Sequence, residues 1–139
     1  MGNSYDIKIR CISANIAHLY QIFLEVMFLK DKSFSDFIKK RFNPELYDKI
    51  IDPATLTQDT SYHYIANNIQ QLAKHVGWNT KFISFDACNN NTEFMLVVEY
   101  CYNNESRYWY SLEEKAKQYP NVQFIEEITG DETSTKIYN

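Results

Sequence analysis

The sequence predicts an α+β fold, a four-stranded antiparallel sheet with helices on one face. Apolar and polar residues alternate near the start of the chain and again in its second half, which is typical of half-buried strands. Between these segments the apolar residues recur at helical spacing, which is typical of helices that pack on a sheet. The chain has 139 residues, so we expect a single domain over residues 1–139.

The first strand is expected within residues 1–12, and a helical block over residues 13–77 follows it. Charged residues separate the apolar members of this strand, which are Tyr5, Ile7, Ile9 and Cys11. Ser13 or Asn15 can cap the first helix of the block, because both side chains accept hydrogen bonds from free backbone N–H groups. The apolar face of that helix consists of Ile16, Leu19, Tyr20, Phe23, Val26 and Met27.

Three further helical segments are expected inside the block. One helix is expected over residues 33–42, and a short helical turn is expected to follow over residues 46–51. The last helix begins after Thr60 or Ser61 and ends at Gly77, because glycine adopts the left-handed conformation common just after a helix. Its apolar residues share one face, and they are Ile65, Ile69, Leu72, Ala73 and Val76.

A β-hairpin is expected at the start of residues 78–129. Its two strands, over residues 80–88 and 93–102, are rich in aromatic and β-branched residues. Three consecutive asparagines lie between them, and asparagine tolerates the positive φ that a tight turn requires. We therefore expect these two strands to pair in antiparallel fashion.

A short helix and a closing strand complete residues 78–129. Ser111 and Glu114 form a capping box that opens the helix, and Pro120 stops it. The last strand is expected over residues 122–128, and residues 130–139 are expected to form a flexible polar tail. The order of elements predicts a split β-α-β arrangement of the ferredoxin-like kind, with an enlarged helical insertion after the first strand.

Four short motifs stand out in the second half of the chain, and they are Trp78-Asn79-Thr80-Lys81-Phe82, Tyr108-Trp109-Tyr110, Gln118-Tyr119-Pro120-Asn121 and Glu126-Glu127. Together they resemble the ferredoxin-like domain of the YubB/Api92 family of plasmids and phages, over residues 78–139. The chain departs from the family pattern at Asn79, where Gly is usual, and at Phe82, where a second Trp is usual. The resemblance implies an accessory protein of a mobile genetic element with no established enzymatic activity, in which Trp78 and Trp109 pack under the sheet.

No catalytic or metal-binding motif is present in the sequence. His18, His63 and His75 are the histidines, and their spacing fits neither a HExxH motif nor a two-histidine metal site. The GxSxG, GxGxxG and phosphate-loop patterns are also missing. We therefore expect a protein that is not an enzyme and that needs neither a cofactor nor a metal.

The cysteines and the lengths of the apolar runs indicate the cellular compartment in which the protein is expected. The three cysteines are an odd number without a CxxC pair, which fits a reducing environment better than a disulfide framework. The start of the chain lacks a basic region followed by an apolar run, and no apolar stretch approaches the ~20 residues of a membrane span. We expect a soluble, cytoplasmic protein without a membrane partner.

Acidic and aromatic residues indicate a first candidate binding surface. Residues 1–70 carry as many acidic as basic side chains, so the net charge of −4 falls on the second half of the chain. Tyr and Trp beside carboxylates suit the basic surface of a protein partner. The predicted partner-binding residues are Tyr108, Trp109, Tyr110, Glu113, Glu126 and Glu127. The alternatives are a Tyr-rich core and ordinary solubilising charge around a buried Trp.

A basic run indicates a second candidate surface, which consists of Lys32, Lys39, Lys40 and Arg41. These side chains can contact RNA phosphates or an acidic protein, and the alternative is a solvated helix face. An RNA-recognition motif is not expected, because the segment from Thr92 to Tyr100 begins with an acidic residue and lacks the required Gly. The acidic net charge also disfavours a general binder of the nucleic-acid backbone.

Together these observations predict a non-enzymatic protein-binding factor of a phage or other mobile element. The expected partner is a nucleic-acid-handling enzyme or its RNA complex, and the leading target is a nuclease of bacterial defence, which makes the chain an anti-CRISPR candidate. Two alternatives stay open, an immunity protein that neutralises a cognate toxin and a direct RNA-binding module.

Overall fold

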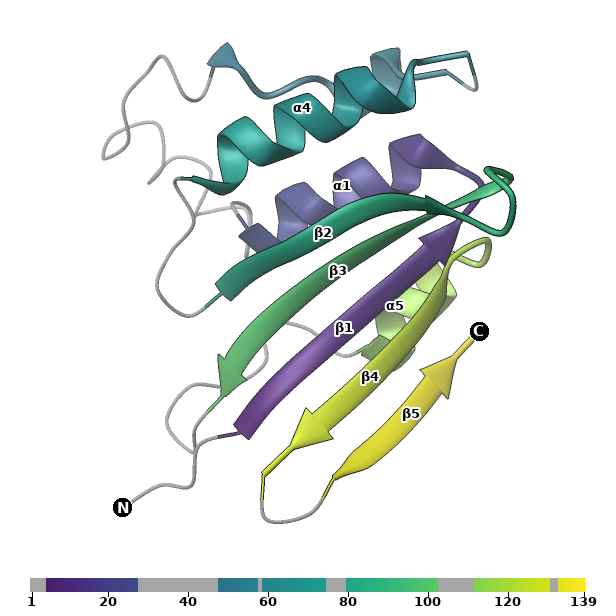
Figure 1. The fold of residues 1–139 in the computed structure, drawn as a ribbon. Helices are drawn as coiled ribbons and strands as arrows, with labels where there is room; N and C mark the ends of the chain where they lie inside the picture. Colours follow the sequence, from purple (N-terminus) through teal and green to yellow (C-terminus); the bar gives the residue numbers. More distant parts are fainter. Residues whose placement is uncertain (1–4, 28–47, 58, 75–79, 103–111, 131–132) are drawn as a thin grey trace.

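The computed structural model describes residues 5–27, 48–57, 59–74, 80–102, 112–130 and 133–139. It has the predicted α+β character, with helices on an antiparallel sheet (Figure 1). The elements follow one another as β1 (Tyr5–Ser13), α1 (Ile16–Met27), the short 3-10 helix η1 (Pro53–Thr55), α4 (Tyr62–Ala73), β2 (Thr80–Cys88), β3 (Glu93–Tyr102), α5 (Leu112–Gln118), β4 (Gln123–Thr129) and β5 (Ser134–Tyr138).

The sheet has five strands in the order β2-β3-β1-β4-β5, and every neighbouring pair is antiparallel. Strand β1 lies at the centre, between β3 and β4, as Figure 1 shows. Its alternate residues Ile7, Ile9 and Cys11 are each 1% exposed and face the helices. The opposite residues of β1 point to the other face of the sheet, because side chains alternate along a strand.

The prediction of four strands and a polar tail is wrong, because residues 134–138 form the fifth strand. Tyr138 pairs with Phe124, and Ile137 pairs with Ile125. Cross-strand pairs of this kind stabilise a sheet, and the Thr, Ile and Tyr of this segment are strand-forming residues. The segment is too short and too polar to indicate a strand by itself, so β4 supplies the template on which it forms.

Two local predictions are confirmed at the ends of elements. Asn15 is the residue that caps α1, since its Oδ1 accepts hydrogen bonds from the backbone N–H groups of Ala17 at 3.0 Å and His18 at 3.3 Å. Ser13 supports this cap, because its Oγ accepts from the N–H of Asn15 at 3.0 Å. The three asparagines that join β2 to β3 adopt positive φ angles, as the hairpin prediction requires, and they are Asn89 (49°), Asn90 (60°) and Asn91 (67°).

Some predicted elements lie outside the described residues. They are the helix over residues 33–42, the first part of the helical turn over residues 46–51, and the end of the helix at Val76 and Gly77. The positions proposed for Trp78 and Trp109 also lie outside them.

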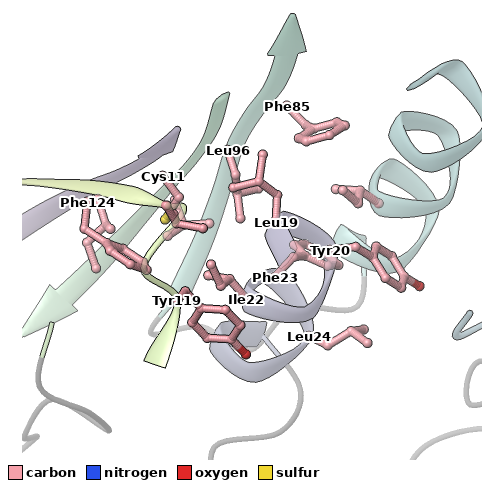
Figure 2. Close-up of a cluster of buried hydrophobic side chains, with 14 of the residues drawn as sticks. Cys11, Leu19, Tyr20, Ile22, Phe23, Leu24, Phe85, Leu96, Tyr119 and Phe124 are labelled. Atoms are coloured by element: carbon pink, nitrogen blue, oxygen red, sulfur yellow. The ribbon is translucent and has the colours of Figure 1, made fainter. Parts of the chain in front are cut away.

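The hydrophobic core lies between the sheet and the helices, with α1 at its centre (Figure 2). Leu19, Tyr20 and Phe23 of α1 are all 0% exposed. Burial of one such side chain contributes about 1.5–3 kcal/mol, so this face of α1 is a principal source of stability. On α4, Tyr62 stacks on Phe94 with ring centroids 5.5 Å apart, and its hydroxyl group donates to the carbonyl oxygen of Phe85 at 2.8 Å. Helix α4 is thereby fixed to the β2–β3 hairpin.

Candidate functional site

The structure describes three of the predicted site residues, Glu113, Glu126 and Glu127. The others lie outside the described residues, and they are Tyr108, Trp109, Tyr110, Lys32, Lys39, Lys40 and Arg41. The predicted aromatic anchor and the predicted basic run therefore have no structural account here.

The two adjacent glutamates of β4 lie on opposite faces of the sheet. Glu126 faces the helices and is 6% exposed. Glu127 faces away from them, where its Oε1 accepts a hydrogen bond from Nη1 of Arg10. This hydrogen bond, helped by the charges of Arg10 and Lys8 and opposed by a smaller effect of burial, lowers the pKa of Glu127. The structure thus does not join Glu126 and Glu127 into one acidic surface.

Tyr138 of β5 is instead a neighbour of both Glu126 and Glu113 of α5, because the charges of both carboxylates act on its hydroxyl group. Burial raises the pKa of Tyr138, and the negative charges of Glu126 and Glu113 raise it further. The Tyr138 hydroxyl group consequently keeps its proton at neutral pH and remains a hydrogen-bond donor. We call Glu113, Glu126 and Tyr138 the acidic tyrosine surface. Lys136 is exposed and pairs with Glu126 in the β4–β5 register, so one cation borders this surface.

Sequence reasoning missed Tyr138 as a member of this site, because it assigned residues 130–139 to a tail. The pattern Ser-Thr-Lys-Ile-Tyr carried the available signal, since it is rich in strand-forming residues. Nothing in the sequence showed that this strand would add to β4 next to Glu126.

A second polar cluster joins α1 to α5. Glu25 accepts a hydrogen bond from the Tyr119 hydroxyl group at 2.9 Å and pairs with Nζ of Lys115 at 2.6 Å. Burial, and then the charge of Glu25, raise the pKa of Tyr119. His18 meets the Tyr119 ring edge-on with centroids 5.5 Å apart, and its Nδ1 is buried without a hydrogen-bond partner in the described part of the chain. Figure 2 shows Tyr20 and Tyr119 on opposite sides of α1.

A groove of about 730 Å³ lies between this side of α1 and residues 52–57. Its two carboxylates are already engaged, because Asp52 accepts from the N–H of Ala54 at 3.0 Å and Glu25 is bound as described above. No Ser, Cys or Lys occurs among the described residues that line the groove. Thr57 is a hydroxyl residue of this lining, and its Oγ1 accepts a hydrogen bond from the N–H of Asp59 at 3.2 Å.

Metal sites and membrane spans each require a particular arrangement of residues. No cluster of three or more His, Cys, Asp or Glu side chains among them is placed to hold a metal ion. None of the described helices is long and apolar enough to cross a membrane.

Comparison with known proteins gives no relative. No protein-family model, no curated protein and no solved structure matches this chain.

Proposed function

We propose that this chain is a non-enzymatic protein-binding factor that binds a basic protein through the acidic tyrosine surface. The observation that supports the proposal is the position of Tyr138, which shares its surroundings with Glu113 and Glu126 across three elements. Tyrosine contributes a large contact area and a hydroxyl donor at low entropic cost, and the exposed carboxylate of Glu113 attracts Lys and Arg. Enzymes that handle nucleic acids carry such cations where they contact phosphate, so a protein that covers them inhibits the enzyme.

The partner class follows from this charge and from the resemblance to the YubB/Api92 family. We propose a factor of a phage or other mobile element that inhibits a bacterial defence nuclease, as anti-CRISPR proteins do. An immunity protein for a cognate toxin has the same physical signature and is the second candidate. Direct RNA binding by Lys39, Lys40 and Arg41 is a third function, which the experiment below separates from the other two.

The strand order supports a finer description of the fold. Strands β2, β3, β1 and β4 are neighbours in the order of a split β-α-β unit, in which β3 lies between the two strands that a helical connection joins. We infer a ferredoxin-like unit to which β5 is added at the β4 edge. The added strand is the one that brings Tyr138 to Glu126.

The proposal is tested by affinity capture of the tagged chain from a bacterial lysate, with and without RNase, followed by mass spectrometry. Glu113→Lys and Tyr138→Ala remove the acidic tyrosine surface. Glu114→Lys makes the same charge change at the next residue of α5, and Tyr64→Ala removes a tyrosine that is 55% exposed on α4. Thermal unfolding of each variant shows whether it is folded.

We expect one nuclease or toxin to remain bound after RNase treatment, and to be lost from Glu113→Lys and Tyr138→Ala but not from the two controls. The purified chain should then inhibit that enzyme. Equal retention by all folded variants would overturn the surface assignment. Loss of every partner on RNase treatment would replace protein binding by RNA binding and make Lys39, Lys40 and Arg41 the next residues to mutate.

A further inference from the structure

The sheet face that points away from the helices carries a row of alternating charges. One residue from each of four neighbouring strands lies in this row, and in spatial order they are Lys81 (β2), Glu99 (β3), Lys8 (β1) and Glu127 (β4). The pairs Lys81–Glu99, Lys8–Glu99 and Lys8–Glu127 are direct partners in the strand register. The charges in this row therefore alternate between positive and negative across the sheet.

An apolar band lies beside this row on the same face. It comprises Ile12, Met95, Val97, Ile125 and Ile137. Ile137 is 59% exposed, whereas Val97 is only 5% exposed between its neighbours. An open face of an antiparallel sheet is ordinarily polar, so a band of this kind indicates a surface that meets another protein.

The order of the charges makes the face complementary to itself. Two copies can stack face to face about a two-fold axis that runs parallel to the strands. Across the interface, the strands of the second copy then follow the reverse order, and each residue keeps its position along the strand direction. With the axis between β3 and β1, Lys81 of one copy lies over Glu127 of the other, and Glu99 lies over Lys8. All four contacts per row pair opposite charges.

The same operation matches the apolar band in part. Val97 lies over Arg10 of the other copy and Ile125 over Ser84, while Ile137 on β5 lies beyond the edge of β2. Met95 pairs with Ile12 in the β1–β3 register, and these strands flank the axis, so Met95 of each copy lies over Ile12 of the other. Arg10, which lies between Val97 and Ile125 in the register, sends its guanidinium group to Glu127. Its aliphatic stem therefore remains available for contact with the apolar band.

We propose that a second copy of this chain covers the open sheet face, in a two-fold symmetric dimer centred between β3 and β1. Four strands about 4.8 Å apart, paired over about seven residues of roughly 3.3 Å each, make a face of roughly 450 Å² per copy. Two copies then bury roughly 900 Å², slightly less than the roughly 1,000 Å² of a stable specific interface, so we expect a weak, transient dimer. The acidic tyrosine surface lies on the helix side of the sheet, so the second copy does not cover it.

The dimer is tested by sedimentation velocity of the purified full-length chain from about 5 to about 300 µM, a range that brackets a weak interface. Glu99→Lys places two cations over each other and should raise the dissociation constant at least tenfold. Lys8→Glu combined with Glu99→Lys exchanges the two central charges and should restore association. A Glu99→Lys variant that had merely failed to fold would not be rescued in this way. Met95→Lys should also weaken the dimer, while Lys136→Glu on the opposite face of β5 should leave it unchanged.

A chain that stays monomeric over the whole range would overturn the proposal. Dimerisation that neither Glu99→Lys nor Met95→Lys weakens would overturn the assignment to this face. A monomer whose captured protein partner is lost with Met95→Lys would give the face to a different protein and also overturn the proposal. None of these outcomes depends on Glu113 or Tyr138, so they leave the proposed function to its own experiment.

Discussion

The hydroxyl group of Tyr20 donates a hydrogen bond to Oδ1 of Asn68, 2.6 Å away, and accepts one from the backbone N–H of Ile51 at 3.0 Å. Asn68 in turn donates through Nδ2 to the carbonyl oxygen of Lys49 at 2.8 Å. One buried phenol thereby joins α1 and α4 to the segment that precedes η1. It gives the apolar core a polar border with satisfied hydrogen bonds on this side.

Tyr20→Phe should lower the free energy of unfolding by about 1–3 kcal/mol, because the Ile51 N–H group and Asn68 Oδ1 lose their partner while the ring volume is kept. Urea unfolding followed by circular dichroism measures the change. Tyr64→Phe is the matched control, since Tyr64 is 55% exposed and should change the unfolding free energy by less than about 0.5 kcal/mol. An equal effect of the two substitutions would show that the hydrogen bonds of Tyr20 add nothing to stability.

The free energy of unfolding should decrease above about pH 10. Burial raises the pKa of Tyr20 to about 12 from its ordinary value of 10.0. The folded chain therefore holds this proton more tightly than the unfolded chain, so the stabilisation is complete below pH 10 and is lost as the pH rises towards 12. The urea midpoint should fall over this window, and Tyr20→Phe should flatten the fall. A pH-independent midpoint in both proteins would contradict the burial of the ionisable hydroxyl group.

Cys11 and Cys88 should differ in reactivity. Cys11 is 1% exposed in the centre of the core, and burial raises the pKa of its thiol far above the usual range. Cys88 is half-buried at the end of β2, and burial followed by the charge of Glu93 raises its pKa. Because the thiolate is the reactive form, a maleimide should label Cys88 first and Cys11 only under denaturing conditions. Peptide mass spectrometry after timed quenching resolves the two sites, and early labelling of Cys11 would contradict its place in the core.

Deletion of residues 133–139 should destabilise the chain, because it removes β5 and leaves the edge of β4 bare. The five cross-strand pairs between β4 and β5 contribute about 1–5 kcal/mol together, at roughly 0.2–1 kcal/mol each. Deletion of Asn139 alone is the control, since it keeps every strand pair. Urea unfolding compares the three chains, and an unchanged midpoint in the longer deletion would show that β5 adds no stability.

The regular elements with a clear periodicity could be predicted from the sequence. The alternation in β1 and β3, the helical spacing in α1 and α4, and the three asparagines of the β2–β3 turn are local patterns, and each produced the expected element. Strand β5 could not be predicted in this way, because a short polar strand depends on a neighbour that is distant in sequence. The β-bulge near Ile83 likewise has no local signal.

The candidate site was less predictable than the fold. A strand over residues 122–128 was expected, and the alternation of side chains in such a strand already places Glu126 and Glu127 on opposite faces. The prediction placed both glutamates on one surface because both are acidic, and it did not apply the alternation of side chains along the strand. The closeness of Glu113 to Tyr138 depends on the packing of α5 against β4 and β5, which is a property of the tertiary structure and not of either segment.

The central position of β1 affects how the chain folds during its synthesis on the ribosome. Strand β1 leaves the exit tunnel early, yet both of its neighbours, β3 and β4, belong to the last third of the chain. The backbone N–H and C=O groups of β1 therefore have no strand partner while α1 and α4 are synthesised. Contacts between segments so far apart in sequence slow folding and prolong exposure of unpaired strands. We expect nascent chains to remain protease-sensitive until β4 has emerged, and to depend on chaperones during that interval.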